Sequence, residues 1–381
     1  MSTWHLECSS CDARQPGDAL ASVCPSCGQP WLVRYDSPWP SRDAIGRRWD
    51  MWRYSAVLPL RGGEKPVSLG EGATPMLDLP LLAHELGVAQ LWVKDEGLNP
   101  TASFKARGMS AAVTRAAALG VAGLVVPTAG NAGAALSAYG AAAGLPVRVF
   151  APASTPAPIL ATIRALGAHL ELVEGHIGDA GKQARAFAAE QGYFDVSTLR
   201  EPYRIEGKKT MGIEIAEQLD WSLPTHIVYP TGGGTGLIGM WKVFNEMRDG
   251  GWLPRDVGLP HMVSAQAAGC APIVRAFHEH ADRATPWENP QTHASGLRVP
   301  SALGDRLILR ALYDSNGDAG SASEDAIRAA TARLSRASGV DVGPEGGCAL
   351  AVLEVLVREG RVPASARVLV FNTGSGASYR I

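Results

Sequence analysis

The sequence contains no long hydrophobic run and no excess of charge of one sign. No apolar stretch reaches the roughly 20 residues that a membrane-spanning helix needs. Residues Met1–Cys11 lack the basic region and apolar core of a secretory signal. Lys and Arg together number 35 and Asp and Glu 37, so the formal net charge is −2. This near balance favours neither nucleic acid nor an anionic membrane as a partner. We therefore expect a cytoplasmic protein.

The glycine-rich segments lack the features that nucleotide-binding enzymes need. The run Gly232–Gly234 is not followed by the lysine that completes a P-loop. No Gly-x-Gly-x-x-Gly turn occurs with an acidic residue about 20 positions later in a strand–helix–strand context. These absences argue against nucleoside triphosphate hydrolysis and against an oxidoreductase that uses a dinucleotide.

Cysteine is scarce, with six residues, but four of them are arranged in two Cys-x-x-Cys pairs. In a reducing compartment such pairs are typical of metal sites. Four thiolates suit a structural Zn²⁺, which would also supply the folding energy of a short segment. Iron is a second option, and free thiols or a disulfide are the plain alternative. The predicted ligands are Cys8, Cys11, Cys24 and Cys27. We interpret Cys270 and Cys348 as small buried residues.

Short apolar runs alternate with alanine-rich helical stretches after residue 69. This alternation is typical of parallel sheets covered by helices on both faces. Hydrophobic residues make up 46% and charged residues 19%, as in ordinary globular chains. The fold class is therefore α/β, with two parallel-sheet domains and an N-terminal zinc-ribbon-like appendage. Predicted strands lie at 91–94, 123–127, 147–150, 169–173, 227–229 and 367–371, and predicted helices at 105–119, 134–143, 157–166, 179–191 and 210–219.

Four segments place small or polar residues where a strand ends and a helix begins. In parallel α/β folds, ligands bind at this edge, and free amides at a helix start hold anions. Lys105 opens one of these helices, although alone it could equally be a surface lysine, and each turn alone could be a plain connection. The segments are Asn99–Met109, Val126–Gly133, Pro230–Gly239 and Val370–Gly376.

Together and in this order, the four segments resemble those of the fold-type-II pyridoxal-phosphate enzymes, the tryptophan synthase β-like family. The resemblance covers roughly Leu69–Tyr379. It implies two α/β domains of the tryptophan synthase β type and a homodimer acting on a small amino-acid substrate. The implied domains are a ribbon at 1–36, a large cofactor domain at 37–95 and 205–381, and a small α/β domain at 96–204.

The resemblance also implies a role for each matched residue. Lys105 matches the lysine that binds pyridoxal 5'-phosphate and then removes the substrate Cα proton. Asn131 matches the partner of the cofactor 3-hydroxyl, and Thr373 the neutral partner of the pyridine nitrogen. The family's phosphate loop is matched here by Gly232, Gly233, Gly234, Thr235 and Gly236. The family's turn that holds the substrate carboxylate is matched by Thr128, Ala129, Gly130 and Asn131.

Within this family the chain is most similar to threonine synthase, through Asn99–Met109 and Tyr203–Thr210. This predicts a lyase that converts O-phospho-L-homoserine to L-threonine and phosphate. Ala106, Ala129 and Glu201 depart from the threonine synthase pattern, and Thr231–Ile238 resembles the loop of threonine dehydratase or serine racemase. A threonine or serine ammonia-lyase, or a β-replacement enzyme, is the alternative reaction. A catalytically inactive zinc-ribbon scaffold is the alternative of another class.

Overall fold

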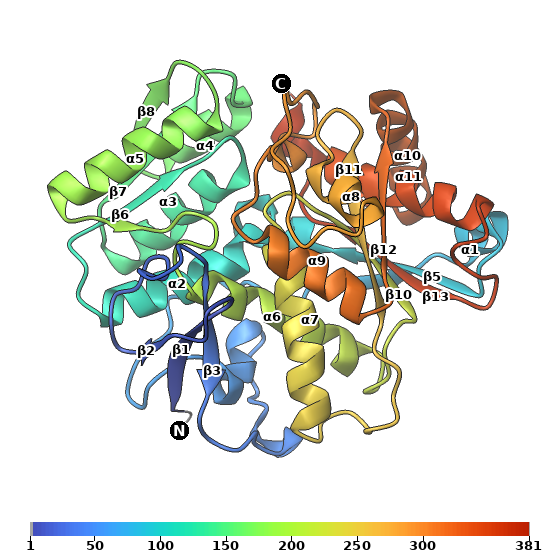
Figure 1. Cartoon of the computed structure of the whole chain (residues 1–381), viewed down its shortest axis with the longest axis horizontal. Helices are drawn as coiled ribbons and strands as arrows, with labels where there is room; N and C mark the ends of the chain where they lie inside the picture. The colour runs from blue at the N-terminus through green and yellow to red at the C-terminus, as the bar shows by residue number, and fades with distance from the viewer. Residues whose placement is uncertain (1–2, 381) are drawn as a thin grey trace. The chain divides into compact units, whose positions relative to one another are not determined.

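A computed structural model describes residues 3–380, and these divide into two compact units (Figure 1). The first unit comprises the chain up to Ala73, Asn99–Thr210 and the chain from Ser378. The second comprises Thr74–Leu98 and Met211–Ala377. Helix α6 (Tyr203–Gln218) belongs to both units, since the division falls after Thr210. Within the described residues, no helix has the length and apolar character needed to cross a bilayer.

The N-terminal part of the first unit is a small antiparallel sheet in the order β2-β1-β3. The strands are short because two cysteine-bearing loops interrupt them. Their inward-facing side chains, such as Trp4, Leu6 and Val33, are buried. Two 3-10 helices follow, η1 (Arg42–Ala44) and η2 (Met51–Val57). The strands are β1 (Trp4–Cys8), β2 (Arg14–Pro16) and β3 (Trp31–Tyr35).

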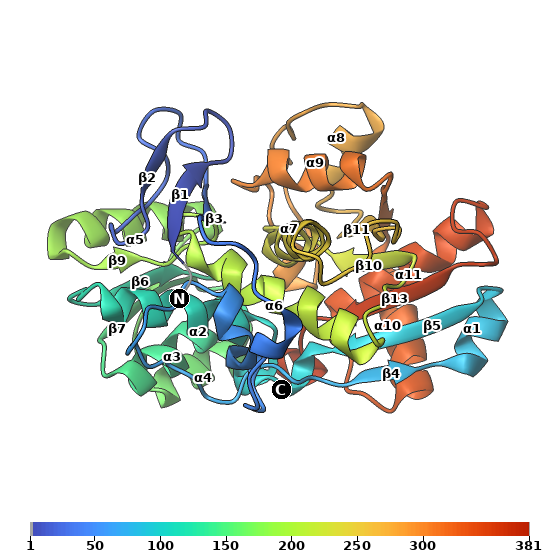
Figure 2. The ribbon, with the colours of Figure 1, turned by 90° about the horizontal axis from the view of Figure 1, so that it is seen from below.

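The larger part of the first unit is a parallel sheet in the order β8-β7-β6-β9. Figure 2 shows α5 on one face of this sheet and α2, α3 and α4 on the other. The buried strands are rich in valine, which packs well on a pleated surface. The strands are β6 (Leu124–Pro127), β7 (Val147–Pro152), β8 (His169–Val173) and β9 (Phe194–Asp195). The helices are α2 (Lys105–Ala118), α3 (Asn131–Ala143), α4 (Ala157–Ala165) and α5 (Ile177–Gln191).

The small antiparallel sheet and the parallel sheet of the first unit share one hydrophobic core. Trp4, Leu6 and Trp31 belong to the same buried cluster as Met109 of α2 and Tyr203 of α6. The Tyr203 hydroxyl also donates a hydrogen bond to the Gly17 carbonyl at 2.6 Å. Because the core is continuous, the N-terminal segment is an integral part of this unit and contributes to its stability.

The second unit contains a six-stranded sheet in the order β12-β11-β10-β13-β5-β4, parallel except for β4. In Figure 2, α7, α8 and α9 lie on one face, while α1, α10 and α11 pack on the other. The strands are β4 (Met76–Asp78), β5 (Gln90–Asp95), β10 (His226–Pro230), β11 (His261–Ala267), β12 (Asp318–Ala322) and β13 (Arg367–Asn372). The helices are α1 (Pro80–Leu86), α7 (Thr235–Asp249), α8 (Pro272–His278), α9 (Asp305–Asp314), α10 (Glu324–Ser338) and α11 (Pro344–Arg358).

The α/β class and the parallel sheets predicted from the sequence are confirmed, and most predicted elements lie within a few residues of the observed ones. The predicted helix near Thr210 is an exception, because α6 begins at Tyr203. The Glu201 carboxylate accepts hydrogen bonds from the Tyr203 and Arg204 amides and so stabilises an earlier start. Cys270 and Cys348 are buried, as predicted.

Candidate active site

Lys105 is the first residue of α2, and its side chain is half-buried. Its ammonium nitrogen lies 3.9 Å from the centroid of the Phe104 ring. The fully buried ammonium of Lys208, from α6, lies 4.0 Å from the same centroid and donates a hydrogen bond to the Phe104 carbonyl. The Phe104 ring is therefore in cation–π contact with two lysines, one of which fixes the backbone next to Lys105.

The two helices that carry these lysines approach closely because glycines face each other. A Cβ on Gly207 would lie 2.0 Å from the Arg107 carbonyl oxygen, and one on Gly108 would lie 2.9 Å from the Lys208 side chain. Side chains at either position would push the helices apart. This accounts for the glycines in both segments of the sequence that suggested the family. The close approach holds Lys208 against the start of α2.

Ser103 lies two residues before Lys105 and is completely buried. Its hydroxyl has no hydrogen-bond partner in the part of the chain that the structure describes. A buried hydroxyl without a partner costs roughly 1–3 kcal/mol, so such a group is expected to bond to a water or to a bound ligand. Ser103 was absent from the predicted site residues because one serine in a sequence carries no sign of being unsatisfied.

The turn between β6 and α3 is organised by the Thr128 hydroxyl. This oxygen donates to the Gly130 carbonyl at 2.7 Å and accepts from the Gly130 and Gly133 amides at 3.1 and 3.2 Å. The hydroxyl is thus occupied within the turn. The amides of Ala129, Asn131 and Ala132, and the Asn131 side chain, have no partner among residues 3–380. Helix α3 contacts η4 (Pro100–Ala102), which brings this turn near the lysine segment.

The glycine loop of the second unit leaves a longer row of amides open. None of the backbone amides of 232–237 has an acceptor within the described chain, and α7 has no side-chain cap at Gly234. Gly234 has a φ of +75°, which favours glycine. A Cβ on Gly232 would lie 2.2 Å from the Gly296 carbonyl, and one on Gly236 would lie 2.0 Å from the Tyr229 hydroxyl. A row of amides at a helix start binds an anion such as phosphate.

Thr373 follows β13, which pairs in parallel with β10. The residue after β13 and the loop after β10 therefore lie at the same edge of the sheet. Thr373 is a buried residue, and its hydroxyl has no protein partner within residues 3–380. The neighbouring Asn372 differs, because its side chain bonds to Asp95 and to the Gly343 amide. Thr373 is thus the residue of the pair that is available to a ligand.

Glu201, a departure from the threonine synthase pattern, is completely buried at the start of α6. Burial raises the pKa of its carboxyl to about 7, although the positive charge of Arg204 acts in the opposite direction. One carboxylate oxygen accepts from the Tyr203 amide at 2.7 Å. The Arg204 guanidinium donates to the Val196 carbonyl at 2.8 Å. The carboxylate is therefore held by the helix start.

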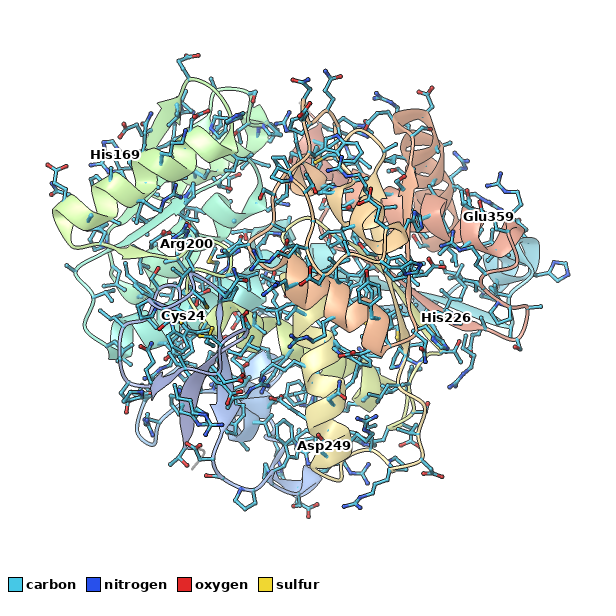
Figure 3. All side chains as sticks on the ribbon, viewed as in Figure 1. Cys24, His169, Arg200, His226, Asp249 and Glu359 are labelled. Carbon is cyan, nitrogen blue, oxygen red and sulfur yellow. The ribbon has the colours of Figure 1, made fainter. Side chains whose placement is uncertain are left out.

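The four paired cysteines gather at one point, with all their sulfurs within 4.8 Å of one another. Cys8 and Cys27 sulfurs are 3.4 Å apart, and Cys11 and Cys24 sulfurs are 3.6 Å apart. A Zn²⁺ ion bound to four tetrahedral thiolates at 2.3 Å keeps the sulfurs roughly 3.8 Å apart. The cluster, in which Cys24 is labelled in Figure 3, therefore has the size of a four-cysteine metal site.

These residues fit the groups that a pyridoxal-phosphate enzyme needs. Within the first unit they comprise an amine at a helix start, a buried hydroxyl without a partner and a turn with open amides. Within the second unit they comprise a glycine-lined row of amides and the open hydroxyl of Thr373 at the same sheet edge. Sequence reasoning named most of them, but it missed Ser103 and Lys208, whose significance depends on contacts between distant segments.

Comparison with known proteins agrees with this reading. A model of the family described as "Pyridoxal-phosphate dependent enzyme" matches residues 67–374. A threonine synthase of Methanosarcina acetivorans is 35% identical over 376 residues, which cover 97% of this chain and 91% of that protein. One from Methanocaldococcus jannaschii is 34% identical with the same coverage, and one from Mycobacterium leprae is 33% identical over 89% of both chains.

Solved structures show the same fold. Maize serine racemase matches with a TM-score of 0.67 at 19% identity, covering 80% of this chain and 88% of that one. Threonine deaminase isoform 2 from Solanum lycopersicum matches with a TM-score of 0.67 at 20% identity, covering 79% of each chain. With the matched family model and the threonine synthase relatives, these findings show that the chain belongs to the pyridoxal-phosphate-dependent enzymes of fold type II and is a threonine-synthase-like lyase.

Proposed function

We propose that this protein is a threonine synthase, which converts O-phospho-L-homoserine to L-threonine and phosphate. The observation that carries the proposal is its similarity to proteins of that name over nearly the whole chain. Residues in each unit support it, since the first unit has a lysine at a helix start and a turn with open amides, and the second unit has a glycine loop whose amides can hold an anionic group. The substrate has two such groups, a carboxylate and a phosphate, and the cofactor has its own phosphate.

We assign the residues as follows. Pyridoxal phosphate, when bound, supplies the electron sink that allows the Cα proton of an amino acid to be removed. Lys105 holds the cofactor through Nζ and, once released, accepts that proton on Nζ. The amides of 232–236 hold the cofactor phosphate. The amides around Asn131 hold the substrate carboxylate, and the Asn131 side chain contacts the cofactor 3-hydroxyl.

Thr373 favours elimination over transamination in this proposal. It offers a neutral hydroxyl to the pyridine nitrogen, and a neutral partner does not favour the protonated ring as a carboxylate would. A ring that stays neutral is a weaker electron sink, which suits rapid loss of a leaving group. The buried position and open hydroxyl of Thr373 support this assignment.

Glu201 does not argue against a phosphorylated substrate. A free carboxylate beside a phosphate would repel it. The Glu201 carboxylate instead accepts amides of α6, and burial with a raised pKa reduces its negative charge near neutral pH. The departure at Ala129 favours the second candidate, a threonine or serine ammonia-lyase, because that position offers no hydroxyl near the substrate.

The test is a spectroscopic titration of the purified protein. We expect an absorption band at roughly 410–420 nm, as a lysine-bound cofactor gives. It should be absent in Lys105→Ala and retained in Lys182→Ala, whose lysine is exposed on α5. A shift of the band with O-phospho-L-homoserine, together with release of threonine and phosphate, supports threonine synthase. Release of ammonia from threonine or serine supports the ammonia-lyase. A protein that stays colourless with added cofactor contradicts both.

We also propose that Cys8, Cys11, Cys24 and Cys27 bind one structural Zn²⁺. The gathered sulfurs support this, and a closed shell of four thiolates leaves no position for catalysis. Elemental analysis should find about one zinc per chain. Cys24→Ser should lose it, whereas Cys270→Ala, which removes a buried cysteine outside the cluster, should keep it. A red protein with iron in place of zinc would contradict the choice of metal.

We make three further proposals, of which the homodimer and the domain division rest on the family resemblance and the cytoplasmic location rests on the sequence. The chain is proposed to be a homodimer, which light scattering would test. It is proposed to be cytoplasmic, where thiolates stay reduced and able to bind metal. The division into a ribbon at 1–36, a cofactor domain at 37–95 and 205–381 and a small domain at 96–204 stays a prediction, which limited proteolysis near residue 36 would test.

A further inference from the structure

A second group of potential ligands lies in the second unit, at the edge of the sheet away from the glycine loop. His226 and His261 are the first residues of the neighbouring parallel strands β10 and β11, where they pair in register. The glycine loop follows the last residue of β10, so a strand length of roughly 13 Å separates it from His226. The group is therefore distinct from the proposed cofactor site. Figure 3 labels His226 at the start of its strand.

The two imidazole rings are close and both border one cavity. Their centroids are 4.7 Å apart with a tilt of 37°. A metal ion bound by two imidazole nitrogens at 2.0–2.1 Å keeps the ring centroids roughly 4.5–5.2 Å apart, for bond angles between square-planar and tetrahedral. The observed separation lies in that range. The cavity, which both rings line with Asp318 and Arg361, has a volume of about 210 Å³.

The hydrogen bonds of the two rings leave their outer nitrogens available. His261 Nδ1 lies 2.9 Å from the carbonyl oxygens of Ser315 and Asn316, so this nitrogen is the donor and Nε2 is the nitrogen left for a ligand. His226 Nδ1 lies 2.9 Å from the Thr225 hydroxyl, which is also within reach of the Arg367 carbonyl. Neither Nε2 has a protein partner among residues 3–380. A second partner at Nδ1 is typical of metal-binding histidines.

The two charged side chains that line the cavity, Asp318 and Arg361, form an ion pair. Arg361 is also bonded to Glu359, which lies outside the cavity lining, so its guanidinium is neutralised by carboxylates.

We propose that His226 and His261 bind a divalent transition metal through their Nε2 atoms. Imidazole ligands select Zn²⁺, Ni²⁺ or Cu²⁺ over Mg²⁺ or Ca²⁺. In the described chain only the four-cysteine group gathers three or more such ligands, so water completes the coordination here. The cavity has room for several waters of about 30 Å³ each. Metal binding at a two-histidine site of this kind is reversible, and the bound metal would stabilise the folded second unit.

The experiment uses the tag-free, zinc-loaded holoenzyme and Ni²⁺ as the probe. Equilibrium dialysis should find one bound Ni²⁺ per chain with zinc retained, and Ni²⁺ should raise the melting temperature. His226→Gln and His261→Gln should each weaken Ni²⁺ binding at least tenfold and abolish the thermal shift. His169→Gln, which removes an imidazole in the first unit, should change neither. The cofactor absorbance of each variant shows that it is folded.

Two results would overturn the proposal. One is the absence of bound Ni²⁺ in the wild type, which would identify the two rings as a packing contact only. The other is Ni²⁺ binding that survives both substitutions or that releases zinc, which would place the ion at the cysteines. Neither result bears on the proposed reaction, because the histidines take no part in it.

Discussion

Two helices of the second unit begin in opposite ways. Helix α10 follows Ser323, whose side chain accepts a hydrogen bond from the Ala326 amide at 3.2 Å. Helix α7 follows Gly234, which has no side chain to offer, and the amides of 232–237 stay open. A helix start that is capped by its own side chain serves stability, while a start lined with glycine leaves its amides for a ligand. The residue before a helix therefore distinguishes the two uses.

The first unit repeats this contrast. Helix α6 is capped by the buried Glu201 carboxylate, whereas α3 follows Gly130 and leaves the Asn131 and Ala132 amides open. The open start is still ordered, because the Thr128 hydroxyl holds the turn from one residue further back. Thus the open start of α7 depends on glycines that allow close packing, and the open start of α3 depends on the Thr128 hydroxyl. Substitutions at the four helix starts test whether this difference is real.

The largest effect is expected from Gly236→Ala in the glycine loop. The new methyl group would lie 2.0 Å from the Tyr229 hydroxyl, on a buried ring that packs against Phe371. Overpacking of this kind costs about 1–3 kcal/mol. If the strain shifts the amides, cofactor affinity should fall by roughly tenfold to a hundredfold. The cofactor absorbance measured against added cofactor gives this value.

The control for that substitution is Gly258→Ala, because no atom lies within 4 Å of its added Cβ and its φ is not positive. This variant should bind the cofactor as the wild type does. Equal cofactor affinity in Gly236→Ala and Gly258→Ala would contradict a tightly packed phosphate loop.

Thr128→Val should have the next largest effect. Valine keeps the volume but removes the hydroxyl, which leaves the Gly130 amide without its acceptor at a cost of roughly 1–3 kcal/mol. The Gly133 amide then keeps only the Gly130 carbonyl at 3.4 Å. We expect the KM for the amino-acid substrate to rise more than kcat falls, while the cofactor band persists. Thr128→Ser keeps the hydroxyl and should restore most of the affinity. If serine fails to rescue the KM, the hydroxyl does not organise the turn.

The sequence predicted the two open starts unequally well. Gly232–Gly234 stands out in the sequence as three consecutive glycines after an apolar run, although it points to a phosphate loop only together with the other three segments. The role of Thr128 was predicted as direct substrate contact, while its hydroxyl is occupied inside the turn. Which atoms a threonine bonds to depends on the backbone path, and residue type alone does not reveal it.

The capped start of α6 was harder still to predict. The sequence predicts a helix from about Thr210, although the helix begins at Tyr203. A carboxylate buried at a helix start is unusual, since burial of a charge is costly unless hydrogen bonds offset it. The approach of Lys208 to Phe104 was likewise beyond prediction, because it joins segments 104 residues apart.

Glu201→Gln should change the pH dependence of stability. Burial raises the pKa of Glu201 from its usual value of 4.5 to about 7, so the folded state holds a proton that the unfolded state releases. Wild-type stability should therefore decrease as the pH rises from about 4.5 to 7, by up to about 3 kcal/mol from this group. Glutamine still accepts the amides but does not ionise, so the variant should lose this slope. Melting temperatures between pH 5 and 8 measure it.

Glu190→Gln is the matched control, because Glu190 is an exposed residue of α5. Its melting temperature should follow that of the wild type across the same pH range. If Glu201→Gln and the wild type show parallel curves, burial does not raise the pKa of Glu201 in the folded protein.

The smallest effect is expected from Ser323→Ala at the start of α10. Loss of an N-cap side chain costs about 1 kcal/mol, which lowers the melting temperature by a few degrees. The cofactor affinity should stay unchanged, because the Ala326 amide serves only its own helix. Measuring stability and cofactor affinity for both Ser323→Ala and Gly236→Ala separates the two uses of a helix start. A capped start should change stability alone, whereas an open one should change binding as well, and a change of cofactor affinity in Ser323→Ala would remove the distinction.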